Sequence, residues 1–241
     1  METIKIAHLY YDLMNLYGEH GNVLALRHHL ENHKVRVITH YLSMEDNIDF
    51  SKYDIFYIGS GNKENFLFVL DNMLKHKSEF IKAYKENKFF IVTGNALDFF
   101  GKAYYTNDNI KKETLGLFNY EAHETDFRIV GETEATMKNS PKEIIGFQNR
   151  SSVLKFVKDP HLFDIKSGTG YQPKSTSEGI KKNNFYGTYI LGPILIRNPY
   201  FTEYLVKQIL KDKKIEYQEY QDKNEIKAYN EYKKNLLNED I

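Results

Sequence analysis

The chain has 241 residues, and its 33 basic and 33 acidic side chains give a formal net charge of zero, which argues against nucleic acid as a partner. It contains no cysteine, so disulfides, thiolate metal sites and any cysteine nucleophile are excluded. No apolar run approaches the ~20 residues of a membrane helix, and the N-terminus lacks the apolar core of a signal peptide, so we expect a cytoplasmic protein without membrane insertion.

The first half of the chain alternates strand and helix patterns. Alternating or compact apolar runs predict strands, and apolar residues at helical spacing, such as Val23, Leu26 and Leu30, predict helices. The expected strands cover residues 4–12, 35–42, 53–61 and 89–93, and the expected helical stretches cover 23–34, 64–87 and the segment after residue 95. This order predicts a parallel sheet covered by helices on both faces.

The second half is richer in short strand patterns separated by polar turns. These patterns lie at residues 115–122, 127–135, 143–151, 152–157 and 185–196. They predict an antiparallel extension of the same sheet. A helix is expected from Phe201, and the charged tail that follows is expected to be helical as well.

Three glycine-bearing turns are the candidate ligand-binding elements, because open α/β sheets bind ligands beyond the carboxyl ends of their strands. They are the loop at 15–22, the turn at 59–61 and the turn at 93–95. For any one of these turns alone, the better explanation is that its glycine supplies a positive φ angle in a tight turn.

Together, five segments resemble the glutaminase subunit of lipid II isoglutaminyl synthase, the GatD family. They are NLYGEHGNVLALRHH (15–29), DIFYIGSGNKE (54–64), IVTGNALDFFGK (91–102), IIGFQNR (144–150) and GTYILGPIL (187–195). The resemblance implies the class I glutamine amidotransferase fold of the cobyric-acid-synthase-like branch, a three-layer, flavodoxin-like α/β fold. It places one such domain at residues 1–210 and a helical tail of the same unit at 211–241.

The family's chemistry is glutamine hydrolysis by a cysteine that a histidine activates. The ammonia passes to a Mur-ligase-like partner, MurT, which uses ATP to amidate the D-glutamate of the peptidoglycan stem peptide. In this chain the cysteine position falls on Gly94 and the histidine position falls on Leu191. Neither side chain can perform its part of the reaction, so the catalytic site is expected to be vestigial.

The resemblance also implies a pocket around these positions. Its oxyanion-stabilising residues would be Gly59, Ser60, Gly61 and Asn95. Arg128 matches an arginine suited to the α-carboxylate of glutamine. Asp98 replaces a glutamine common in the family, and its negative charge weakens the case for retained glutamine binding.

Substitute chemistry finds little support in the sequence. Thr93 adjoins the turn, but its side chain should point away from the nucleophile position, and Ser60 belongs to the oxyanion loop. His29 and His33 stand four residues apart on a helix and could share a metal, but a partly solvated helix flank is the favoured interpretation. We expect no metal and no cofactor.

The sequence therefore predicts a catalytically inactive GatD-like protein that binds or regulates a MurT-like ligase. Two alternatives stay open. One is a working glutaminase with displaced catalytic groups, and the other is an independent protein that binds glutamine or a related small amide. The inactive subunit and the working glutaminase would both act in peptidoglycan biosynthesis.

Overall fold

The computed structural model describes residues 2–138, 140, 142–220 and 222–238. Its first sheet, sheet A, has six strands in the order β11-β12-β4-β3-β1-β2. All neighbours are parallel except β11 and β12. The strands are β1 (Thr3–Leu9), β2 (Arg36–Leu42), β3 (Ile55–Ile58), β4 (Phe89–Thr93), β11 (Ile180–Lys182) and β12 (Phe185–Thr188). The predicted mainly parallel sheet is confirmed.

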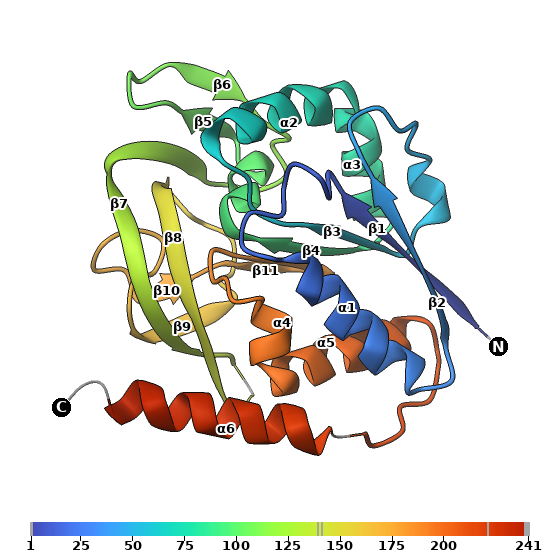
Figure 1. Ribbon diagram of the computed structural model, residues 1–241. Coiled ribbons are helices and arrows are strands. Elements are labelled where there is room, and N and C mark those ends of the chain that lie inside the picture. Colours follow the sequence, from blue (N-terminus) through green and yellow to red (C-terminus); the bar gives the residue numbers. More distant parts are fainter. Residues whose placement is uncertain (1, 139, 141, 221, 239–241) are drawn as a thin grey trace.

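Helices cover both faces of sheet A (Figure 1). The α-helices are α1 (His20–Glu31), α2 (Lys63–Lys75), α3 (Lys77–Lys85), α4 (Ile194–Arg197), α5 (Pro199–Asp212) and α6 (Lys223–Asn238). Successive side chains of a strand point to opposite faces. Accordingly, Phe56 and Ile58 pack with α2 and α3, whereas Ile55 and Tyr57 pack with α1 and α5. The result is the three-layer arrangement that the sequence predicts.

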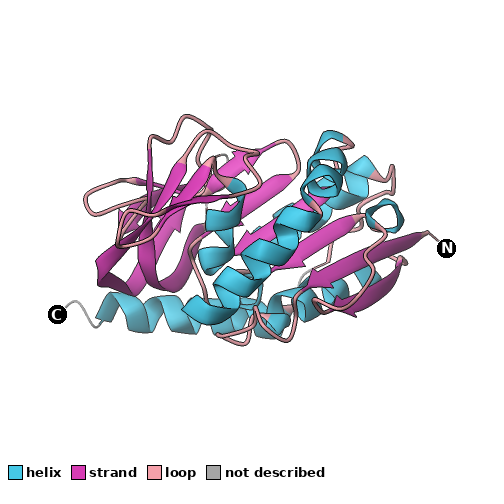
Figure 2. Ribbon diagram, turned by 90° about the horizontal axis from the view of Figure 1, so that it is seen from above, coloured by secondary structure: helices cyan, strands magenta, loops and turns pink. Residues whose placement is uncertain are grey.

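The remaining strands form a second sheet, sheet B, in the order β10-β9-β7-β5-β6, with β8 paired to β7. They are β5 (Ala103–Tyr105), β6 (Lys111–Glu113), β7 (Glu121–Thr136), β8 (Glu143–Lys155), β9 (Phe163–Ser167) and β10 (Ser177–Glu178). Figure 2 shows sheet B beside sheet A. The antiparallel part of the fold is confirmed. The expectation that it extends the same sheet is wrong except at residues 185–188, which form β12 of sheet A and run parallel to β4. The long β7–β8 pair belongs to sheet B.

Local backbone geometry changes two further predictions, whereas the helices expected from Phe201 and in the tail are confirmed. The helical stretch at 64–87 is divided at His76, whose φ and ψ of −108° and 19° are not helical. The segment after β4 is a 3₁₀ helix, η2 (Gly94–Phe100), and a second short one, η1 (Phe50–Lys52), precedes β3. Helix α5 continues past residue 210, and α6 follows in the tail. Among the described residues, no helix combines the length and apolar character needed to span a bilayer.

Candidate functional site

The glycine turns lie next to each other at the carboxyl-terminal edge of sheet A, where its parallel strands end, because β3 and β4 are parallel neighbours. Ile58 pairs with Val92 at the carboxyl ends of these strands, so the turns that follow lie side by side. The loop after β1 joins them, since Leu16 donates its backbone N–H to the carbonyl of Ser60 at 3.0 Å. This edge is where the sequence places the ligand-binding turns.

Gly94 directly follows β4 and has a φ of +62°, a conformation that favours glycine. A Cβ atom at this position would stand 1.6 Å from the hydroxyl oxygen of Ser60 and 3.0 Å from Cδ2 of Leu191. Leu191 is buried and exchanges two backbone hydrogen bonds with Phe147 of β8. The two residues to which the resemblance assigns the family's cysteine and histidine positions therefore lie against each other, and the Ser60 hydroxyl fills the space that a side chain at Gly94 would take.

The backbone N–H groups at this edge are already bonded to side chains of the chain itself. Asn95 donates its N–H to Ser60 Oγ at 3.3 Å, and Gly61 donates its N–H to Asn95 Oδ1 at 3.1 Å. Asn95 Nδ2 in turn donates to the carbonyl of Gly61 at 2.8 Å. An oxyanion hole requires free donors aimed at the developing charge. Here Ser60 and Asn95 occupy these donors.

A buried carboxyl group lies beneath the turns, and sequence reasoning missed it. Glu19 is fully buried and accepts hydrogen bonds from the Ser60 backbone N–H and the Thr93 hydroxyl, both at 2.6 Å. Burial raises its pKa to about 7, although these hydrogen bonds act in the opposite direction. The only feature of the sequence that could have indicated this buried carboxyl group is the position of a charged residue between two glycines in NLYGEHGN.

The Glu19 carboxyl belongs to a longer buried network. The hydroxyls of Thr93 and Tyr57 are 2.8 Å apart, and Asn22 donates to the Tyr57 hydroxyl at 2.7 Å. Asn22 also accepts the backbone N–H of Leu195 at 2.8 Å. Thr93 is thus buried, and its hydroxyl connects β4 with α1 through this network.

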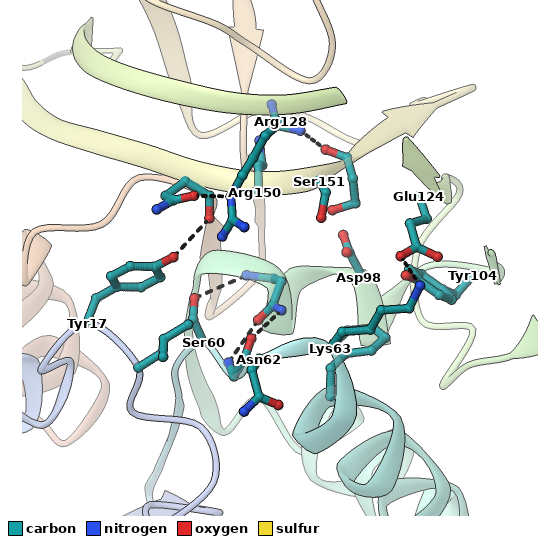
Figure 3. Close-up of a pocket in the computed structure, with 16 residues that line it drawn as sticks. Tyr17, Ser60, Asn62, Lys63, Asp98, Tyr104, Glu124, Arg128, Arg150 and Ser151 are labelled. Carbon is teal, nitrogen blue, oxygen red and sulfur yellow. Dashed lines mark hydrogen bonds and ion pairs between the residues drawn. The ribbon is translucent and has the colours of Figure 1, made fainter. Parts of the chain in front are cut away.

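A cavity of about 180 Å³ opens above this edge, between sheet A and sheet B (Figure 3). Ser60, Gly61, Asn95 and Arg128 all line it, as the resemblance implies. Gly59 does not, because it is buried where a Cβ would stand 2.7 Å from the Met14 carbonyl and 2.9 Å from the Glu19 carboxyl. Leu191 lies behind the cavity, next to Gly94.

Arg128 is exposed on β7, on the side of the cavity opposite Ser60 (Figure 3). Its Nε donates to Oδ1 of Asn149 on β8 at 2.6 Å. This bond uses one of five donors, so the remaining guanidinium N–H groups are available to a carboxylate. At the mouth, Lys63 forms an ion pair of 2.5 Å with Glu124.

Asp98 forms part of the cavity floor and is almost completely buried. The Tyr189 hydroxyl donates a hydrogen bond to Oδ1 of Asp98. Burial raises the pKa of Asp98 to about 6 despite this bond and the nearby Arg150. The Arg150 guanidinium lies 4.0 Å above the Tyr189 ring. The cavity thus has a carboxyl group at its floor and an arginine at its rim.

The histidine pair on α1 differs from its predicted setting. His29 and His33 are both buried by the segment that leads into α6, so the expectation of a partly solvated flank is wrong. His29 Nε2 lies 2.7 Å from Oε2 of Glu225, and His33 Nδ1 accepts the backbone N–H of Gln218 at 3.3 Å. The two rings therefore bind different partners.

Comparison with known proteins identifies the family. The lipid II isoglutaminyl synthase (glutamine-hydrolyzing) subunit GatD of Streptococcus pneumoniae is 30% identical over 214 residues, which cover 87% of this chain and 82% of the relative. The chain belongs to the GatD family. The GatD subunit of Staphylococcus aureus is 27% identical over 218 residues, which cover 90% of this chain and 89% of that one. No protein-family model matches the chain.

A solved glutamine amidotransferase has the same fold as this GatD-family chain. It aligns with a TM-score of 0.57 and 10% identity over 84% of this chain and 98% of its own length. The predicted amidotransferase fold is confirmed.

Proposed function

We propose that this chain is a catalytically inactive member of the GatD family that serves as a binding or regulatory subunit of a MurT-like ligase in the cytoplasm. The ligase would amidate the D-glutamate of the peptidoglycan stem peptide with free ammonia and ATP. The curated relatives are named as subunits of lipid II isoglutaminyl synthase, which supports an equivalent assembly here. The chain itself would need neither a cofactor nor a metal for this role.

The observation that carries the inactivity is the position of Ser60. Its hydroxyl oxygen takes the space of a side chain at Gly94 and accepts the Asn95 N–H, while Asn95 accepts the Gly61 N–H. The region around Gly94 then has no nucleophile, no base and no free donors for an oxyanion. Removal of a single oxyanion donor costs about 10²–10³ in kcat in hydrolases, and this site lacks more than one component.

The cavity supports a binding role for the same chain. Arg128 offers donors to a carboxylate, so a free amino acid or a small amide that carries a carboxylate fits its chemistry. Such a molecule would bind as a ligand and leave unchanged. Binding of this kind would let the activity of the attached ligase respond to the supply of nitrogen.

A relocated nucleophile is the second candidate, and the same serine favours it. Ser60 Oγ stands where a family cysteine would project, and the carboxyl of Glu19, with a pKa of about 7, lies beneath it. In this scheme Ser60 attacks the glutamine amide and its proton passes to Glu19. Glu19 then protonates the departing ammonia, and water hydrolyses the ester to glutamate. The Asn95 N–H, however, is bonded to the attacking oxygen itself.

The choice of nitrogen source by the assembled complex tests the proposal. The tagged chain is purified from its native organism, and co-purifying proteins are identified by mass spectrometry. We expect a Mur-ligase-like protein whose complex amidates its substrate with ammonium chloride and not with glutamine. Glutamine-dependent amidation at a comparable rate would overturn the proposed inactivity. Absence of any such ligase from the purified material would overturn the subunit role.

A further inference from the structure

Besides the titratable side chains around the cavity, a separate cluster lies where the N-terminal end of α6 is next to α1 (Figure 1). Ligand atoms of His28, Asp222 and Glu225 all lie within 4.8 Å of one another. The neighbouring His29 holds Glu225 at 2.7 Å, across 196 residues of sequence. We propose that this cluster binds one divalent transition-metal ion, with Zn²⁺ as the best-matched probe, and that the ion fastens the C-terminal helix to α1.

Each ligand keeps an atom free for the ion. Oε2 of Glu225 bonds His29 Nε2, which leaves Oε1 to bind metal. Oδ1 of Asp222 accepts the backbone N–H of Asn224 at 2.8 Å, which leaves Oδ2. The exposed His28 ring packs edge-on against the rings of His29 and Tyr220, and its Nε2 lies 3.1 Å from the Tyr220 hydroxyl, a neutral partner that an ion can displace.

The donor set and its spacing select the metal. One imidazole and two carboxylates suit zinc and its neighbours in the first transition series, whereas Mg²⁺ and Ca²⁺ prefer oxygen ligands alone. Tetrahedral donors bound at ~2.1 Å stand roughly 3.4 Å apart. The ligand atoms now lie within 4.8 Å of one another, so binding requires them to approach by up to about 1.4 Å. Water would complete the coordination.

The local charge also favours a cation. The N-terminus of α6 contributes about +0.5 of an elementary charge, whereas two ionised carboxylates contribute about −2. His29 supports the site from outside, because a histidine that bonds a ligating carboxylate fixes its orientation. The cluster thus combines net negative charge with an imidazole that is held nearby.

An ion at this place would act on the whole tail. Helix α6 is also held farther along, where the Tyr229 hydroxyl donates to the Glu143 carbonyl at 2.9 Å and Lys233 pairs with the Glu143 carboxylate at 2.7 Å. These contacts connect α6 to the start of β8. Binding at the N-terminal end of α6 would therefore fix a helix that joins both halves of the fold.

The test titrates ZnCl₂ into the full chain without a histidine tag, after treatment with EDTA and dialysis, and follows binding by calorimetry. We expect one ion per chain. His28→Ala and Glu225→Gln should weaken binding about tenfold or more. His161→Ala is the matched control, because it removes a histidine that pairs with Asp164 at 2.9 Å on the surface, and it should bind as the wild type does.

Hydrogen exchange provides the second measurement. Zinc should slow amide exchange in residues 223–235 of the wild type and leave His28→Ala unchanged, with circular dichroism used to check that each variant is folded. Equal zinc affinity in His28→Ala and wild type would overturn the proposal. So would the absence of stoichiometric binding, or loss of binding in His161→Ala alone.

Discussion

The hydroxyl oxygen of Ser60 occupies the place where a side chain on Gly94 would begin, since a Cβ there would stand 1.6 Å away. The same oxygen accepts the N–H of Asn95 at 3.3 Å. One serine therefore fills the space beside Gly94 and also satisfies the backbone donor next to it. If the proposed inactivity holds, the position of the absent nucleophile is occupied by another side chain of the same chain.

The clash at Gly94 predicts a measurable loss of stability on substitution. Gly94→Ala and Gly18→Ala both force alanine to a positive φ, of +62° and +69°, but Gly18 has no atom within 4 Å of an added Cβ. We expect Gly18→Ala to lower the free energy of unfolding by about 1 kcal/mol, and Gly94→Ala by about 3 kcal/mol. Chemical denaturation measures both. Equal losses, or no recovery of Gly94→Ala in a Ser60→Gly background, would contradict this account.

The same geometry sets the requirement for restoring catalysis. Gly94→Cys with Leu191→His returns a nucleophile and its base, but Ser60 still blocks the thiol and the Asn95 N–H. We expect only trace glutaminase activity from this pair, and at least about tenfold more when Ser60→Gly is added, because residues of a catalytic unit act non-additively. The control is Gly94→Cys with Ser60→Gly, which lacks the base. A double variant as active as the triple one would show that Ser60 is no obstacle.

Sequence patterns could predict the layers of the fold but not the closure of the site. The compact apolar run in residues 53–61 predicts a buried strand, and the structure places Ile55 and Phe56 on opposite faces of sheet A. The contact between Ser60 and Gly94 depends on the relative position of two turns that are distant in sequence, and no local pattern encodes it. Strand β11 could not be predicted either, because three residues are too few to show the periodicity of a strand.

Burial of Glu19 predicts a pH dependence of stability. Its folded-state pKa of about 7 lies above the ordinary value of 4.5, so the folded state holds a proton that the unfolded state releases. The contribution of Glu19 to stability therefore falls as pH rises from about 4.5 to about 7 and is constant above that range. Relative to Glu19→Gln, which does not titrate, the wild type should lose up to about 3 kcal/mol across this window. Parallel stability curves for the two proteins would refute the assignment.

Burial of His8 predicts a pH dependence of stability with the opposite sign. It is fully buried on β1, and neither ring nitrogen has a hydrogen-bond partner within the described part of the chain. Burial, with a smaller effect of His20, lowers its pKa from 6.5 to about 3, so the unfolded state binds the proton first as pH falls. Stability is then lost between about pH 6.5 and about pH 3. Relative to wild type, His8→Leu should gain about 2 kcal/mol between about pH 7.5 and about pH 5, and thermal unfolding at both values measures it.

Glutamate formation by the unmodified protein tests the central claim most directly. The purified chain is incubated with glutamine, once alone and once with its Mur-ligase-like partner. Glutamine is in large excess over the protein, so that glutamate from many turnovers would be detected. We expect no glutamate above the protein-free background in either case. Steady glutamate production that disappears in Ser60→Ala would contradict it and identify Ser60 as a relocated nucleophile.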